Sequence, residues 1–177
     1  MNQKVSLFFR YIILLIVGLP GPYLFYLVFT PLTIYPVFFV LRLFYPSIIL
    51  ENTSLIIGAN TINLIPACIA GAAYYLILIL NLAMPMKLEK RARSIIFAFF
   101  SFLLLNILRI VIFTALFIGG FELFDLAHKL TWYLGSTILV VAIWFLSVYI
   151  FKIKEIPFYT DLKNLSNTII NKGKRKK

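Results

Sequence analysis

The amino-acid sequence predicts an all-α, polytopic membrane protein with four or five transmembrane helices. Of its 177 residues, 62% are hydrophobic and only 13% are charged, which is about half the charged fraction of an ordinary soluble domain. A soluble chain of this size could not bury so much apolar surface. Long uncharged stretches recur, and about 20 such residues in a helix cross a bilayer core of about 30 Å. These observations exclude the soluble and disordered classes, and a single cysteine excludes a disulfide scaffold.

Residues 1–50 are expected to anchor the chain in the membrane by one or two spans. The first apolar stretch runs well past the roughly 7–15 residues of a signal-peptide core and no small-residue cleavage site follows, so we expect an anchor that is not cleaved. Five prolines each remove a backbone donor and tend to kink or end a helix; they are Pro20, Pro22, Pro31, Pro36 and Pro46. The pattern fits either a broken span followed by an interfacial helix or two tightly connected spans.

Residues 51–151 are expected to form the core of the protein. Its first part, 51–65, has β-branched residues on both sides of the turn signal Gly58-Ala59-Asn60, which is typical of a short β-hairpin. Three uncharged or nearly uncharged segments then predict transmembrane helices at about 63–84, 94–118 and 130–151. Residues 152–177 form a basic tail.

The distribution of the 17 Lys and Arg residues predicts the orientation of the chain through the positive-inside rule. With the N-terminus, the 87–93 loop and the tail in the cytoplasm, all the basic residues lie on that side except Arg42, Arg109 and Lys129. We therefore expect a multi-pass protein of the cell membrane with a cytoplasmic basic tail. If the N-terminus is outside instead, only Lys4 and Arg10 change sides. The tail is interpreted as a topology determinant that binds anionic lipid headgroups, and no nucleic-acid partner is expected.

Arg109 is the one charged residue inside an expected span. An Arg near the middle of a bilayer costs about 2.5 kcal/mol or more to insert, so it requires a partner or a cavity. Asn106 lies one helical turn before it on the same helix face. The pair is either a structural polar clamp between helices or part of a functional site.

The chain contains one cysteine and one histidine. Cys68 follows Pro66 near the start of its span, where helix amides favour a thiolate; the alternative is an inert small hydrophobe. His128 precedes the last span, and Asp125, one turn upstream, is placed to orient its imidazole. The alternatives are a surface or interface histidine and a solvated loop carboxylate.

The expected topology brings Cys68, Arg109 and His128 together in the outer half of the bilayer, on three helices. A thiol nucleophile, an imidazole base and a fixed cation form a workable set for acyl transfer. Zinc is disfavoured because one cysteine and one histidine fall short of the three or four ligands it requires. No metal and no cofactor are expected.

Three motifs in this order resemble those of the exosortase/archaeosortase family of membrane-embedded cysteine transpeptidases. They are Ala67-Cys68-Ile69-Ala70-Gly71, Asn106-Ile107-Leu108-Arg109-Ile110, and His128 followed by Gly135. The resemblance covers residues 56–144, and the Asn-x-x-Arg pair at membrane depth is its most specific element. The short chain resembles a minimal, archaeal-type member. It departs from the family in one respect, because Gly71 stands three residues after the cysteine where the family has a glycine two residues after it.

The resemblance implies both a function and a set of roles. Cys68 would be the nucleophile, Arg109 the oxyanion stabiliser and His128 the acid and base. The substrates would be surface-protein precursors that end in a short recognition motif, a transmembrane helix and a basic cluster. The enzyme would cleave at the motif on the outer face of the membrane and pass the acyl group to an amine acceptor such as a lipid headgroup.

Two other functions remain open from the sequence. One is a non-catalytic membrane subunit for assembly or transport, in which Arg109 clamps helices together. The other is a lipid-modifying acyltransferase, which the same cysteine and histidine chemistry would serve. In the catalytic interpretation Asn106 would either hold Arg109 in place or line the substrate groove.

Overall fold

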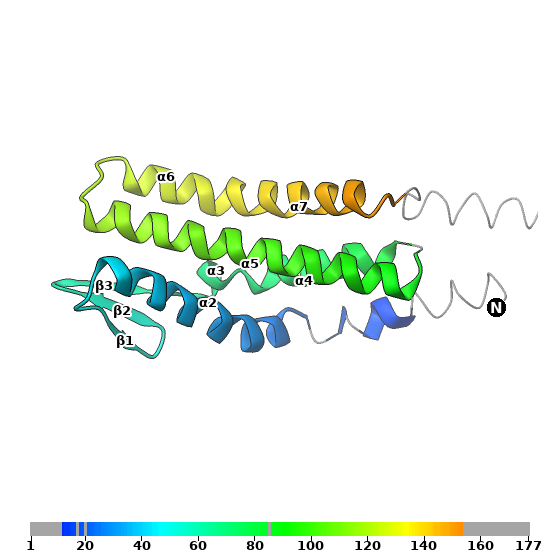
Figure 1. Cartoon of the computed structure of the whole chain (residues 1–177), viewed down its shortest axis with the longest axis horizontal. Coiled ribbons are helices and arrows are strands. Elements are labelled where there is room, and N and C mark those ends of the chain that lie inside the picture. Colours follow the sequence, from blue (N-terminus) through cyan, green and yellow to red (C-terminus); the bar gives the residue numbers. More distant parts are fainter. Residues whose placement is uncertain (1–11, 17, 20, 85, 154–177) are drawn as a thin grey trace, which may run out of the picture.

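The computed structural model describes residues 12–16, 18–19, 21–84 and 86–153, and these form an elongated helical bundle with a small sheet at one end (Figure 1). In this part of the chain four helical stretches are long and apolar enough to cross a membrane, at Tyr23–Phe44, Pro66–Ala83, Leu88–Ile118 and Phe124–Ile150. The predicted multi-pass helical architecture is therefore confirmed. Lys4, Arg10 and the basic tail from residue 154 onward lie outside the described residues.

Helix α2 (Tyr23–Phe44) is the helix of spanning length that the structure describes in the N-terminal region. Pro31 and Pro36 lie inside it and do not end it. Membrane helices tolerate an internal proline where neighbouring helices support the distorted turn. Thr33 and Val37, beside these prolines, are fully buried against the rest of the bundle.

Three antiparallel strands form the sheet: β1 (Ile49–Glu51), β2 (Ser54–Ile57) and β3 (Asn60–Asn63), in the order β1-β2-β3. The predicted hairpin is confirmed as β2 and β3, which are joined by Gly58-Ala59. Gly58 has a φ of +60°, which the first central position of a type II′ hairpin turn requires. Strand β1 was not predicted, and the expected boundary between residues 50 and 51 falls inside it.

The helix that carries Cys68 is shorter than expected and broken. It begins at Pro66 rather than near residue 63, because the chain up to Asn63 belongs to β3, and proline fits the first helical turn, where no backbone donor is needed. Its two parts, α3 (Pro66–Ile69) and α4 (Gly71–Ala83), are separated by Ala70 in the left-handed conformation, with a φ of 58°.

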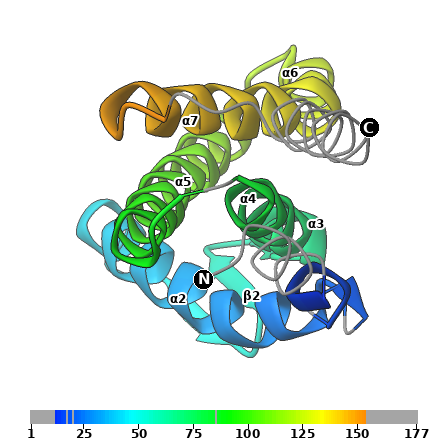
Figure 2. The same ribbon diagram turned by 90° about the vertical axis from the view of Figure 1, so that its right-hand side faces the viewer.

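Helix α5 (Leu88–Ile118) is the central element, and it contacts α2, α3, α4, α6 and α7 (Figure 2). Its 31 residues span about 46 Å, more than the hydrocarbon core requires, and it begins six residues before the expected start at 94. Its buried residues recur every fourth position, at Ser94, Ala98, Phe102, Asn106, Ile110 and Thr114. This row packs as a ridge against its neighbours.

A polar contact ties α5 to α4 at the end of the bundle away from the sheet. The buried hydroxyl of Ser94 donates to Asn81 Oδ1 at 2.7 Å, and Asn81 Nδ2 donates to the Ile77 carbonyl at 2.9 Å. Between this contact and the sheet end, an aromatic core fills the bundle: Tyr74 stacks on Phe29 with 3.6 Å between ring centroids and meets Phe102 edge-on at 4.8 Å.

The last span is one continuous helix that changes its winding. It consists of α6 (Phe124–Leu130), the π-helical turn η1 (Thr131–Gly135) and α7 (Ser136–Ile150). It begins six residues before the expected start at 130, so His128 lies within the helix rather than ahead of it. Charged residues mark where the apolar span ends, but they do not prevent a helix from continuing.

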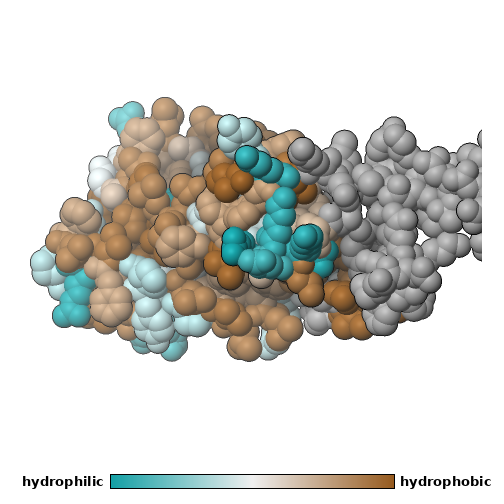
Figure 3. All heavy atoms as spheres, turned by 45° about the vertical axis from the view of Figure 1, so that its right-hand side comes forward, coloured by the Kyte–Doolittle hydropathy of each residue, from teal (hydrophilic) through white to brown (hydrophobic). Residues whose placement is uncertain are grey.

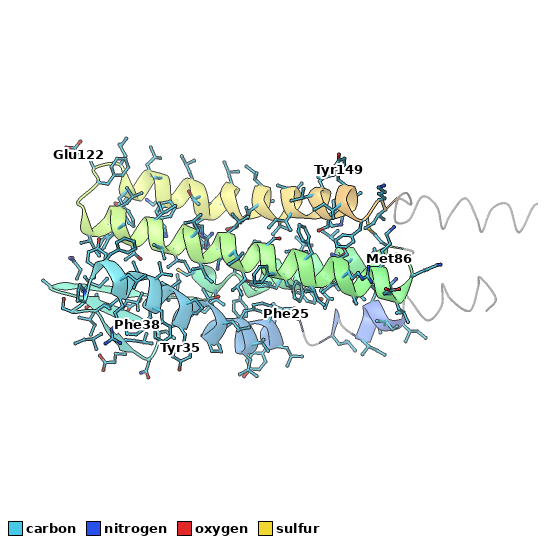
Figure 4. The ribbon with its side chains drawn as sticks, in the orientation of Figure 1. Phe25, Tyr35, Phe38, Met86, Glu122 and Tyr149 are labelled. Atoms are coloured by element: carbon cyan, nitrogen blue, oxygen red, sulfur yellow. The ribbon has the colours of Figure 1, made fainter. Side chains whose placement is uncertain are left out.

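The exterior is that of a membrane protein. Apolar side chains cover most of the flank visible in Figure 3, and hydrophilic ones gather toward the two ends. Figure 4 shows Glu122 at the sheet end, where α5 turns into α6, and Met86 and Tyr149 toward the opposite end. The expected 87–93 loop is instead the first two turns of α5 and its N-cap, and it contributes four basic side chains there, Lys87, Lys90, Arg91 and Arg93.

Replacing Ala70 by Gly is expected to raise the thermal unfolding midpoint in detergent by about 2–4 °C. A residue with a Cβ loses roughly 1 kcal/mol in left-handed backbone that glycine adopts without strain. The matched control is Ala72→Gly, two residues later in regular helix, which should lower the midpoint instead. If both variants lower it equally, the left-handed break at residue 70 is contradicted.

Candidate active site

A pocket of about 370 Å³ opens at the sheet end of the bundle, and Cys68, Arg109 and His128 all line it. These residues come from α3, α5 and α6, so three helices that are separate in the sequence contribute one side chain each. The remaining walls come from β3, the link after it and η1. Cys68 and Arg109 are half-buried and His128 is exposed, so all three side chains are accessible from the pocket.

The break at Ala70 places Cys68 at the end of a single helical turn and frees backbone carbonyls. The amide of Ala73 donates to the Ala70 carbonyl rather than continuing the α-helical ladder to Ile69. A carbonyl left without a donor inside a membrane costs several kcal/mol. The side chain of Asn106 meets this need, since its Nδ2 donates to the Cys68 carbonyl at 2.9 Å and lies 3.5 Å from that of Ile69. Asn106 therefore caps the broken helix.

Arg109 lies one turn further along α5 and joins three helices. Its Nη1 donates to Ser136 Oγ at 2.7 Å, and its Nη2 donates to the Cys68 carbonyl at 3.4 Å. Within the described residues no carboxylate forms a salt bridge with it. A guanidinium has five N–H donors, so donors remain for a ligand, and its charge is not neutralised by the protein. This arrangement suits a carbonyl oxygen or an oxyanion in the pocket.

The ring of His128 is held by aromatic side chains. It stacks on Phe124, four residues earlier on α6, with 5.4 Å between centroids and 9° between planes. Phe113, one turn after Arg109 on α5, meets it edge-on at 5.5 Å. In the described structure His128 and Cys68 line one pocket, and no hydrogen bond joins them.

Asp125 does not take the place expected of it. Its side chain is exposed, it does not line the pocket, and within the described residues it forms no hydrogen bond with His128. Phe124 and Phe113 position the imidazole instead. Asp125 therefore lies outside the pocket, on the exposed surface of α6.

The π-helical turn explains how the last helix places both His128 and Ser136 beside the residues of the other helices. In a regular α-helix, residues eight apart are about 80° out of phase. A π turn absorbs one extra residue, and such turns are frequent at functional sites. The turn at Thr131–Gly135 therefore brings His128 and Ser136 toward the same side of the helix, where Ser136 receives the hydrogen bond of Arg109.

The pocket is largely apolar, and the charged groups in its lining are of one sign. Four aromatic side chains line it, those of Phe113, Phe117, Phe124 and Trp132, and its charged lining residues are Arg109 and Lys129. No carboxylate is among its lining residues. Within the described part of the chain, no group of three or more His, Cys, Asp and Glu side chains is placed to hold a metal ion. The pocket therefore suits a neutral or acidic ligand with apolar groups.

Sequence reasoning did not identify Ser136, the two phenylalanines beside His128, or the contribution of β3. Ser136 follows Gly135, and a small polar residue at the start of an apolar span was a usable signal. The spacing of four between Phe124 and His128 also predicts contact once both are known to be helical. Nothing in the sequence indicates the π turn.

Comparisons with known protein families, curated proteins and solved structures find no match to this chain. The fold and the site define a multi-pass helical membrane protein with a polar cluster at one end of the bundle. Its activity is therefore inferred from the chemistry and the geometry of these residues.

Replacing Asn106 by Leu is expected to lower the free energy of unfolding by about 1–3 kcal/mol, because it leaves the Cys68 carbonyl with a weakened set of donors. The control is Ser147→Ala, which removes a buried hydroxyl that donates to a carbonyl of its own helix, that of Ile143. Unfolding in detergent measures both. Equal losses for the two variants would show that Asn106 does not cap the break.

Proposed function

We propose that this protein is a membrane-embedded cysteine transpeptidase of the exosortase/archaeosortase type, which processes surface proteins at a C-terminal sorting signal. The observation that carries the proposal is the pocket shared by Cys68, Arg109 and His128. These are the side chains that the family resemblance assigns to catalysis, and their residue types supply a nucleophile, a cation and a base.

The reaction begins with His128 accepting the proton of the Cys68 thiol. The thiolate attacks the carbonyl carbon of the scissile peptide bond, and negative charge develops on the carbonyl oxygen. Donors of Arg109 stabilise this oxyanion. As the C–N bond breaks, His128 delivers its proton to the leaving amine, and an acyl group remains on Cys68 as a thioester. An acceptor amine then attacks the thioester, gives its proton to His128 and displaces the thiolate.

Contacts already in the structure support the role of Arg109. Its bonds to Ser136 and to the Cys68 carbonyl hold the guanidinium beside the residue that carries the nucleophile. Because the partners that position it are neutral, the full positive charge is available to the transition state. Donors fixed in advance cost little reorganisation during the reaction.

The depth of the site suits a substrate that is itself anchored in the membrane. Arg109 lies nine residues before the end of α5 at Ile118, or about 14 Å along the helix axis. Under the positive-inside rule the sheet end faces outward, because the basic start of α5 at residues 87–93 lies at the opposite end. The transmembrane helix of a sorting signal would lie beside the bundle with its basic cluster at the cytoplasmic side, and its recognition motif would reach the pocket.

A second candidate function is favoured by one observation. Asn106 and Arg109 both donate to the Cys68 carbonyl, as a purely structural clamp would. In that case the protein is a non-catalytic membrane subunit. Arg109→Ala would then destabilise it, whereas Cys68→Ala would leave its cellular role unchanged.

Cys68→Ala and Cys68→Ser are expected to abolish processing in the source cells, because both variants lack the thiol. Membrane proteomics of the variant cells would show surface proteins that keep their C-terminal sorting signal, which consists of the motif, the apolar helix and the basic cluster. In cells with the native enzyme this signal is cleaved off. The control is Ser147→Ala, far from the pocket, which should process normally. Undiminished processing in the Cys68→Ala cells would refute the mechanism.

Thiol reactivity provides a test that needs no substrate. Cys68 is the only cysteine in the chain, so alkylation by iodoacetamide reports on it alone. His128→Ala is expected to slow alkylation at neutral pH about tenfold or more, since the thiol loses its base. The control is Tyr133→Ala, which removes an exposed ring from the same helical segment. Identical rates in the two variants would favour the structural function.

A further inference from the structure

We propose that the substrate binds as an extended peptide that pairs with the free edge of β3 and so adds a fourth strand to the sheet. This inference rests on the proposed function and specifies how its substrate is held. In the described structure β3 pairs with β2 on one side only. Thr61, Ile62 and Asn63 of β3 line the pocket, and no residue of β1 or β2 does, so the free edge is the one that faces the site.

The register of the sheet identifies the backbone groups at this edge. The Leu64 amide donates to the Thr53 carbonyl at 2.9 Å, on the side of β2. In an antiparallel pair the residues alternate in the direction of their N–H and C=O groups. Leu64 and Ile62 therefore face β2, whereas Thr61 and Asn63 face the pocket.

Three of the outward groups are available to a ligand. The Asn63 carbonyl already accepts a hydrogen bond from the Ile65 amide at 3.1 Å. The Thr61 N–H, the Thr61 C=O and the Asn63 N–H have no protein partner within the described residues. An unpaired strand edge of this kind is a template for an incoming strand.

The edge is continuous with the nucleophile. The chain runs from Asn63 through Leu64 and Ile65 into α3, and these linking residues line the pocket together with Cys68. A peptide paired with β3 therefore presents a bond to Cys68 within about five residues of the paired segment, at no more than about 3.5 Å per residue. Backbone pairing also forces the substrate into the extended form that exposes its carbonyl to attack.

The charge of the lining specifies the side chains that the paired segment carries. Arg109 and Lys129 are the charged residues of the pocket, so a lysine or arginine in the segment would be repelled, whereas neutral or acidic residues fit. The aromatic wall favours apolar groups on the side chains that point inward. The pocket would therefore accept the recognition motif of a sorting signal and repel the basic cluster at its other end.

The test uses peptide chloromethyl ketones on the full-length protein in detergent. The Cys68 thiolate attacks the methylene carbon and forms a C–S bond. The C–Cl bond breaks, and chloride leaves with its electron pair. The parent probe is acetyl-Val-Ala-Val-Ala chloromethyl ketone, with one variant N-methylated at each residue. N-methylation is expected to slow labelling about tenfold at the one residue whose N–H pairs with the Thr61 carbonyl, and less than twofold at the residues whose N–H points away from β3. A probe with Lys in place of the second residue should also label more slowly.

Variants of β3 test the same contact from the protein side. Thr61→Pro removes an N–H that faces the pocket and leaves the ladder to β2 intact, as proline on an edge strand permits. It should slow labelling by the parent probe about tenfold relative to Thr61→Val, which keeps the N–H and controls for loss of the hydroxyl. Iodoacetamide, which pairs with no strand, should alkylate Cys68 equally fast in the two variants.

The outcomes separate this inference from the proposed function. A loss of labelling at a single position of the N-methyl series, together with a defect in Thr61→Pro, supports strand pairing. Equal labelling by all the N-methylated probes overturns strand pairing while leaving the reactive thiol in place. If Cys68 reacts with neither iodoacetamide nor the peptide probe, the proposed function fails and this inference fails with it.

Discussion

The hydrogen bond from the Asn106 side chain to the Cys68 carbonyl is the interaction on which the site depends. A helix that breaks inside a bilayer must find donors for its released carbonyls, because the surrounding lipid offers none. The donor comes from the central helix α5, so the break, the position of Cys68 and the packing of α3 on α5 are aspects of one arrangement. Arg109, one turn away on the same face, also donates to the Cys68 carbonyl.

The left-handed residue at the break gives a physical meaning to the one difference between this chain and the motif of the family that its sequence resembles. A glycine two residues after the cysteine would fall on position 70, where φ is 58° and a Cβ is strained. This chain has Ala70 there and a glycine one position later. At Gly71 the demand is for space, since a Cβ would lie 2.7 Å from the Tyr26 ring. The neighbouring small residues thus satisfy two different constraints, one of backbone conformation and one of close packing between α2 and α4.

Membrane energetics made much of this structure predictable. The cost of burying Arg109 and Asn106 singled out these residues, and the Gly58-Ala59 turn identified the hairpin. Helix ends were predicted less well, because a charge gap marks the hydrocarbon and not the hydrogen-bonded helix. For this reason α5 and α6 begin earlier than expected and His128 lies inside a helix. The contact of Ser136 with Arg109 and the strand β1 were not predicted, since the π turn and a three-residue strand depend on tertiary packing that no local pattern encodes.

Directional polar contacts fasten the central helix α5 to its neighbours at two levels of the bundle. Ser94 with Asn81 at one level, and Asn106 with Cys68 at another, fasten α5 to α3–α4 by directional bonds at both ends. The last helix is fastened to α5 through Ser136, and the Lys152 carbonyl just beyond it accepts a bond from Lys90. Elsewhere it rests on apolar contacts, which have no preferred direction. The segment α3–α4 and the last helix are therefore each held to α5 at two levels, so the separation of the pocket walls is set by contacts made along a single helix.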